Sequence, residues 1–590
     1  MADDHHEVRH VDWHELLGFT HLFKSFKMAI HPSKLLLALM AIILIVAGGY
    51  VMDGFWALAK ARTAPGEIAA FCDVTPAEFK AGLKAWEDGR AKDAKDLWVE
   101  WERQYRSLSS IRDAIPNNDT NDDFSLKDVY RKLAVERARP FTKREIPEGD
   151  LENWSKLLRD AKQVFGEMKK DGDNLLVKAN KQAREAIKTS ASADTRKEKL
   201  EKLDECFLAT RQAMTAMEVD FKEDHDAIRG GAVFKTWLKF EADCVNSAMM
   251  SARAGNILGG MGINNNPDAG FVCFVVRGFK GVMWLVVAHW LFGLILMLFI
   301  LAVWSVLGGA IFRIAAVHAA RDEKISMAQA LKFSVEKFAS FFMAPLLPLI
   351  CSAVLGAAIL LFALLINIPW IGALLYSALF FMLALVGGAA IAFLLIGLVG
   401  GGPLMYPTVA VEGSDGFDAI SRSYSYVFNR PWRAGLYMLV AVIYGSICYL
   451  FVHTFAFVSL KATHSAIKMG VWAGGKEMAG ATDKIDAMWG GPAFDTLQGD
   501  MTLQAVGAMD SLAALVMMFW IYLVIGMVAA FLISYVCSAS TMVYYLLRRQ
   551  VDATDLDDVY ILEDEEAELE VAAAVPAKAP AAEEGDATDA

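Results

Sequence analysis

Residues 338–411 read FASFFMAPLLPLICSAVLGAAILLFALLINIPWIGALLYSALFFMLALVGGAAIAFLLIGLVGGGPLMYPTVAV, a stretch of 74 residues without Asp, Glu, Lys or Arg. A membrane-spanning helix needs about 20 apolar residues, because the hydrocarbon core is about 30 Å thick and a helix rises about 1.5 Å per residue. The stretch is therefore long enough for two spans. Asn367, Ile368 and Pro369 lie near its middle, and proline lacks an N–H donor and disfavours helix before it. The sequence predicts two spans joined by a tight turn.

Other uncharged runs complete the predicted set of spans, at 35–52, 281–312, 434–460 and 511–547. They place span 1 at 35–59, spans 2–5 within 281–460 and span 6 at 510–549. The predicted fold class is all-α, a polytopic helical membrane bundle of about six spans. A cleavable signal peptide is the alternative for span 1, because residues 57–59 read ALA. The long leader and long apolar run favour an uncleaved anchor.

The composition indicates polar regions that alternate with the spans. Hydrophobic residues make up 55% of the chain and charged residues 21%, which is too apolar for a soluble protein and too charged for spans alone. The net charge of -12 comes mainly from the tail, because 551–590 holds 14 Asp and Glu against Lys578 alone. The rest of the chain is nearly neutral, so nothing suggests a nucleic-acid partner. The segment 550–590 is predicted to be an acidic, disordered cytoplasmic tail.

The short loops predict the orientation in the membrane. Lys and Arg cluster before span 1, between spans 2 and 3, between spans 4 and 5, and after span 6. All four clusters fall on one side if there are six spans, and this side is the cytoplasm by the positive-inside rule. Both termini are then cytoplasmic, whereas 60–280 and 461–509 are extracytoplasmic.

Short amphipathic stretches precede the outward-going spans within 1–34, 322–340 and 414–433. They end near His31-Pro32, Ala344-Pro345 and Arg430-Pro431. Aromatic amphipathic helices with flanking cations lie in the membrane interface, and proline suits the bend into a span. This pattern favours three tandem two-span units, with 60–280 and 461–509 as insertions. Ordinary connectors of a multi-span protein are the alternative.

The insertion 60–280 is predicted to be an external helical bundle. Between 200 and 221, apolar residues recur at heptad spacing, with Leu203, Phe207 and Met217 among them. This spacing predicts an antiparallel bundle or coiled-coil hairpin with the segment 154–168. Strand signals are scarce throughout the insertion.

The cysteines divide between this insertion and the spans. Cys72, Cys206, Cys244 and Cys273 lie in the predicted external domain, and an oxidising compartment allows two disulfides among them with three connectivities. Four buried, reduced thiols are the alternative.

Two histidines are the ionisable residues inside predicted spans, His289 and His453. Ionisable groups at such depth are candidates for a functional intramembrane site, with an interfacial hydrogen bond as the alternative. No sequence pattern indicates a catalytic residue, a metal site or a cofactor. The sequence therefore predicts no enzyme.

The most distinctive motif occupies 402–431 and reads GPLMYPTVAVEGSDGFDAISRSYSYVFNRP. It resembles a signature of uncharacterised polytopic membrane proteins of planctomycete-type bacteria. More distantly, it resembles membrane domains associated with glycerophosphodiester phosphodiesterases, whose catalytic domain has no counterpart in this chain. The resemblance implies a bacterial inner-membrane protein and no known activity.

The same motif carries candidate contacts for a partner or for lipid headgroups. The candidates are Glu412, Asp415, Asp418, Arg422 and Arg430. Asp415 can cap a helix, while the arginines can face anionic headgroups.

Two functions follow as expectations. One is a non-enzymatic envelope scaffold, in which the membrane part anchors an external domain that binds protein partners. The acidic tail is a second candidate for partner binding, and a homo-oligomer is compatible with the sequence. The alternative is a small-molecule or ion transporter or channel built from three two-span repeats, with the two histidines along its path.

Overall fold

The computed structural model describes residues 18–58, 62–107, 154–188, 193–256, 270–323, 325–471, 484–499 and 508–560. These residues are almost entirely helical, and among them the only β-structure is one isolated antiparallel bridge between Thr63 and Gly231. The all-α prediction is therefore confirmed. Residues 1–17, 108–153, 257–269 and 561–590, on which parts of the sequence predictions fall, lie outside the described residues.

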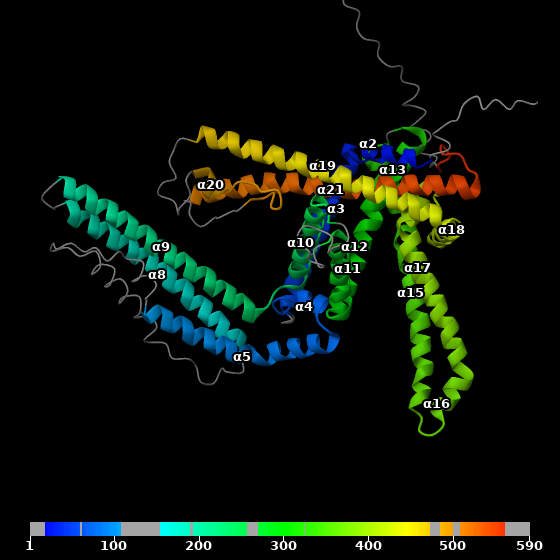
Figure 1. Ribbon diagram of the computed structural model, residues 1–590, viewed down its shortest axis with the longest axis horizontal. Coiled ribbons are helices and arrows are strands. Elements are labelled where there is room, and N and C mark those ends of the chain that lie inside the picture. Colours follow the sequence, from blue (N-terminus) through cyan, green and yellow to red (C-terminus); the bar gives the residue numbers. More distant parts are fainter. Residues whose placement is uncertain are drawn as a thin grey trace, which may run out of the picture. The chain divides into compact units, whose positions relative to one another are not determined.

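The chain forms two compact units (Figure 1). Unit 1 comprises Met1–Ala47, Met297–Leu460 and Phe519–Ala590, and unit 2 comprises Gly48–Leu296 and Lys461–Met518. The elements up to the second span are η1 (Gly18–Phe23), α2 (Lys24–Ala29), α3 (Pro32–Leu58), α4 (Glu67–Asp73), α5 (Pro76–Ser107), α8 (Trp154–Lys188), α9 (Ala193–Arg229), α10 (Val233–Arg253) and α11 (Phe271–Val287). The remaining elements are α12 (Trp290–Val303), η3 (Trp304–Gly308), α13 (Gly309–Arg321), α14 (Met327–Glu336), α15 (Phe338–Ala363), η4 (Leu364–Asn367), α16 (Gly372–Leu375), η5 (Tyr376–Phe380), α17 (Phe381–Glu412), α18 (Gly416–Asn429), α19 (Pro431–Gly470), α20 (Lys484–Met488) and α21 (Ala508–Asp552).

Six helical segments are long and apolar enough to cross a bilayer. They are Pro32–Leu58, Trp290–Arg321, Phe338–Asn367, Gly372–Glu412, Pro431–Gly470 and Leu512–Asp552. The chain is therefore a multi-pass integral membrane protein, and the predicted number of spans is confirmed.

The uncharged stretch 338–411 forms the expected helical hairpin. Helices α15 and α17 lie side by side and are joined through η4 and α16 (Figure 1). At the turn, Trp370 adopts the left-handed conformation with φ 72°, directly after Pro369. Phe362 and Phe380 stack near this end with ring centroids 4.6 Å apart. The proline thus ends the first span, as its missing donor requires.

The second span differs from its prediction. Residues 281–312 were expected to form one span, but α11 ends at Val287 and α12 begins at Trp290. Residues 281–287 belong to α11, which packs closely on α10. A Cβ on Gly281 would lie 2.5 Å from the Glu241 carboxylate oxygen and 3.0 Å from the Phe240 ring, so a larger residue would require these side chains to shift. The span consequently starts at Trp290 and continues through Arg313 to Arg321.

Two of the three X-Pro bends are confirmed. Pro32 and Pro431 occupy the first positions of α3 and α19, where the missing N–H costs nothing. The third prediction is wrong, because Pro345 lies inside α15. The bend there occurs at Lys337, between the short helix α14 and α15.

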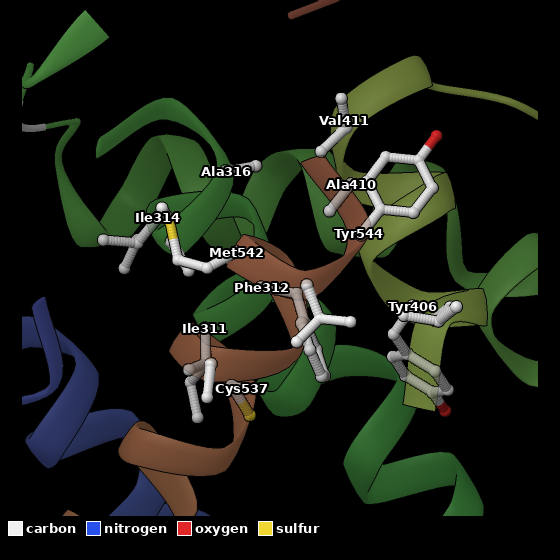
Figure 2. Packing of buried hydrophobic residues seen from close by; sticks show 14 of the residues in the cluster. Ile311, Phe312, Ile314, Ala316, Tyr406, Ala410, Val411, Cys537, Met542 and Tyr544 are labelled. Carbon is white, nitrogen blue, oxygen red and sulfur yellow. The ribbon is translucent and has the colours of Figure 1, made fainter. Parts of the chain in front are cut away.

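The core of unit 1 forms where α13, α17 and α21 meet. Figure 2 shows side chains from these three helices in one buried cluster, among them Phe312, Tyr406 and Met542. The cluster lies near the end of each span that the sequence assigns to the cytoplasmic side.

Two cations lie inside this core rather than in loops. The Arg313 guanidinium is fully buried, donates from Nη1 to the Ala410 carbonyl oxygen over 2.8 Å, and lies over the Phe333 ring. The Lys34 ammonium is also fully buried and donates to Ser538 Oγ over 3.0 Å. Both cations therefore join helices of unit 1 and do not contact headgroups.

Unit 2 contains the predicted external helical domain. Helices α5, α8 and α9 share an aromatic core in which Phe165 and Phe221 stack with centroids 4.2 Å apart and Trp101 packs edge-on against both. Farther along, Ile187 of α8 packs near Leu203 of α9. Helices α8 and α9 thus form an antiparallel hairpin, as the apolar spacing predicted.

Candidate functional site

The predicted acidic and basic residues surround the junction between α17 and α18. Gly413 ends α17 with φ 64°, the left-handed conformation that glycine adopts without strain. Asp415 then caps α18, because its carboxylate accepts from the Asp418 backbone N–H over 2.8 Å. This turn directs α18 back along the core and places Asp418 and Arg422 on one helical face.

Glu412 is the centre of an ion-pair network. Its carboxylate is almost fully buried and lies 2.8 Å from Arg422 Nη1 and 3.3 Å from Arg548 Nε. The Tyr544 hydroxyl donates to the same carboxylate. Arg422 Nε also contacts Asp418 at 3.1 Å. Three of the five predicted residues, Glu412, Asp418 and Arg422, are therefore brought together.

The other two residues have different positions. Asp415 serves as the helix cap, and Arg430 is the exposed residue that ends α18. On α18 itself, Phe417 is exposed, whereas Ala419, Ser423 and the two tyrosines Tyr424 and Tyr426 are buried. The helix packs with this face against α15 and α17.

The network also contains residues outside the predicted set. The segment 553–560 folds back, and the Tyr560 N–H donates to the Val411 carbonyl oxygen over 2.8 Å. Val559 is buried, and Lys337 donates to the Gly413 carbonyl oxygen. The expectation of a disordered tail from residue 550 is thus wrong up to residue 560. An arginine pair directly after an uncharged span, followed by Val559 and Tyr560 between acids, is the signal that could have indicated this.

The ion pairs favour the charged form of Arg422, and the surroundings of Tyr426 favour its neutral form. Burial of Arg422 disfavours its charged form, but Glu412 and Asp418 outweigh burial and raise the pKa of the guanidinium. Burial, and then the hydrogen bond to the Asp552 carboxylate, raise the pKa of Tyr426 well above its ordinary value. Both groups therefore keep their charge state across the physiological pH range.

The two predicted intramembrane histidines belong to different units. His289 lies at the break before α12, where Nε2 is 3.1 Å from Glu67 Oε1. The same carboxylate oxygen accepts from Trp284 Nε1 over 3.0 Å. His289 thus links α4 to the start of the second span, outside the apolar segment. His453 lies within α19 of unit 1 and is buried.

The predicted cysteines are all described, and no disulfide joins any of the seven in the structure. Cys72, Cys206 and Cys244 are buried, and Cys273 is partly exposed. Cys72 lies near enough to Cys244 to contribute to its electrostatics, although burial is the largest cause that raises the pKa of Cys244, to about 11. Disulfide formation in an oxidising compartment stays a prediction.

Among the described residues, no group of three or more His, Cys, Asp or Glu is arranged to hold a metal ion. Comparisons of the chain with protein-family models, curated proteins and solved structures find no match.

Proposed function

We propose that this membrane protein is a non-enzymatic scaffold of a bacterial inner membrane, which presents the helical domain of unit 2 to a protein partner. The observation that carries the proposal is the α8–α9 hairpin. Its helices have 35 and 37 residues, which corresponds to about 50 Å at about 1.5 Å per residue. Among the described residues, the aromatic core with α5 covers the base of the hairpin.

The distal part of the hairpin offers surface for a partner. Its small apolar cluster contains Ala183, Ile187 and Leu203. The Arg184–Asp204 ion pair joins the two helices nearby, and Val177 remains 61% exposed. A long, exposed helical face with a few apolar positions is suited to helix-in-groove or bundle contacts.

Site-specific photocrosslinking in native membranes tests the scaffold. A photoreactive residue at Val177 should give one defined protein adduct, and the same residue at Val99 on α5 is the matched control. Adducts of equal pattern at both positions, or none along the hairpin, would contradict partner binding by this hairpin.

The orientation is part of the same proposal. Impermeant thiol labelling of intact cells should modify Lys178→Cys, whereas Arg430→Cys should react only after the inner face is opened. The parent protein, with its native cysteines, is the control. The reverse labelling pattern would invert the topology and place the hairpin in the cytoplasm.

The transporter alternative makes a different prediction. The second two-span pair, residues 338–411, contains no Asp, Glu, Lys, Arg or His, so these helices supply no charged side chain for a path. Reconstituted protein should show no solute or ion flux above that of empty liposomes. Flux that His453→Ala abolishes would replace the scaffold with transport.

A further inference from the structure

Unit 2 contains a partly open cavity of about 870 Å³ between α4, α8, α9 and α10. Its walls include the buried side chains of Ile68, Phe165 and Phe221. A volume of this size is typical of ligand sites. The cavity belongs to neither the ion-pair network nor the distal hairpin surface.

An antiparallel bridge fixes the base of the cavity. The Thr63 N–H donates to the Gly231 carbonyl oxygen over 3.0 Å, and the Gly231 N–H donates to the Thr63 carbonyl oxygen over 2.9 Å. Gly230 has φ 78°, and a Cβ there would lie 2.6 Å from the Thr63 carbonyl oxygen. Only glycine therefore fits at position 230. The bridge brings the chain next to Thr63 close to the chain next to Gly230, so Arg62 and Arg229 lie near each other at the cavity.

The lining carries an excess of positive charge. Seven Lys and Arg side chains line the cavity against four Asp and Glu. Glu218 contacts Lys169, and Glu67 is directed toward Trp284 and His289. Six cations make no ion pair with another described residue: Arg62, Lys162, Lys222, Arg229, Lys235 and Lys239.

Like charges at close range disfavour one another. Burial, and then the nearby charge of Arg229, lower the pKa of Arg62, and the Asp53 and Asp226 carboxylates offset this only in part. Burial also lowers the pKa of His225, with Lys162 and Arg229 among the further causes. An anion in the cavity would relieve this repulsion, and a phosphate group matches several cations at once because it presents multiple acceptor oxygens.

The cavity lies beside α3, the helix of the first span. The uncharged run of α3 ends at Asp53, whose buried carboxylate accepts from the backbone N–H of Phe234 over 2.8 Å and of Lys235 over 3.0 Å. Lys235, which lines the cavity, therefore stands beside the last turns of this helix. From the cavity, its unpaired cations and this position, we infer that unit 2 binds a phosphate-bearing anion, whose source is either an anionic lipid headgroup or a soluble phosphate compound.

The experiment uses the full-length protein in a non-ionic detergent. Phosphatidylglycerol, phosphatidylcholine and sodium phosphate are titrated at constant ionic strength, and binding is read from the melting temperature and from lipid retained in native mass spectrometry. The test variant is Arg229→Gln/Lys235→Gln. The control is Lys92→Gln/Lys178→Gln, which removes two exposed cations of unit 2 that do not line the cavity.

Phosphatidylglycerol or phosphate should bind the parent and the control with equal affinity. The affinity of the test variant should be at least tenfold lower. Binding of phosphatidylglycerol without phosphate identifies a lipid headgroup, whereas binding of phosphate identifies a soluble ligand. If Arg229→Gln/Lys235→Gln lowers the melting temperature of the unliganded protein, a second variant, Lys222→Gln/Lys239→Gln, takes its place. Equal affinity in the cavity and control variants, or no binding of either anion by the parent, would overturn the inference.

Discussion

Arg548 and Asp558 are joined by two contacts: Nη1 donates to the Asp558 main-chain oxygen over 2.8 Å, and Nη2 lies 2.9 Å from its Oδ2. The Nε of the same guanidinium lies 3.3 Å from Glu412. One side chain at the end of α21 thus holds both the end of α17 and the segment that follows α21.

Loss of the Arg548 guanidinium should release the segment 553–560 and leave the buried negative charge of Glu412 with one cationic partner fewer. We expect Arg548→Gln to lower the free energy of unfolding by about 1–3 kcal/mol, because a buried carboxylate loses a charged partner. Arg549→Gln removes the same charge from an exposed neighbour and should change stability by less than about 0.5 kcal/mol. Melting temperature in detergent and limited proteolysis within 553–560 measure the difference. Equal behaviour of the two variants would show that the contact with Asp558 stabilises nothing.

Close packing of α17 on α18 depends on Gly397. A Cβ there would lie 2.3 Å from the Tyr424 ring, whereas a Cβ on Gly388 in the same helix meets nothing within 4 Å. Gly397→Ala should therefore destabilise the protein by about 1–3 kcal/mol through overpacking. Gly388→Ala should be neutral or stabilising by up to about 1 kcal/mol, because alanine favours helix. Adding Tyr424→Leu should restore most of the stability of Gly397→Ala, and failure of this rescue would place the strain elsewhere.

The α10–α11 contact should make stability depend on pH through Glu241. Burial raises the pKa of this carboxyl from 4.5 to about 7. A raised carboxyl pKa means that the folded protein holds the proton more tightly, so stability falls as the pH rises from about 4.5 to 7 and then levels. Glu241→Gln should remove this dependence. It should raise stability at pH 8 by about 1–2 kcal/mol after allowance for solvent screening, and change it little at pH 4.5. Melting curves of the parent and of Glu241→Gln between pH 4.5 and pH 8 test the sign of this pH dependence. If Glu241→Gln is less stable than the parent at pH 8, the Glu241 carboxylate is compensated in the folded protein.

Oxidation, if it links any external cysteines, should link Cys72 to Cys244. The helices that carry these two residues, α4 and α10, both pack against α11, whereas Cys206 lies on α9. Mass spectrometry of non-reduced peptides from native membranes should identify this pair and leave Cys206 alkylatable. Four alkylatable thiols would show that the external cysteines are small buried side chains only.

The span count and the hairpin within 338–411 were predictable because the bilayer imposes a local requirement. About 20 uncharged residues form a span almost regardless of what packs against them. The break before Trp290 was not predictable in this way, since Trp284 and His289 around it contact Glu67, which is more than 200 positions away in the sequence. The buried face of α18 likewise depends on which residues allow α17 to approach, not on apolar spacing alone.

The sequence by itself determined that this is an all-α membrane protein with six spans and an inserted helical domain. It also indicated Glu412, Asp418 and Arg422 as a group, because their spacing around a capped turn is local. Only the tertiary structure decided that Arg548 and the segment 553–560 complete this group, that Lys34 and Arg313 are buried, and that Arg62 and Arg229 meet at a cavity. Each of these residues has a partner at least 97 positions away in the sequence. Such contacts are selected by packing and charge compensation between whole helices rather than by neighbouring residues.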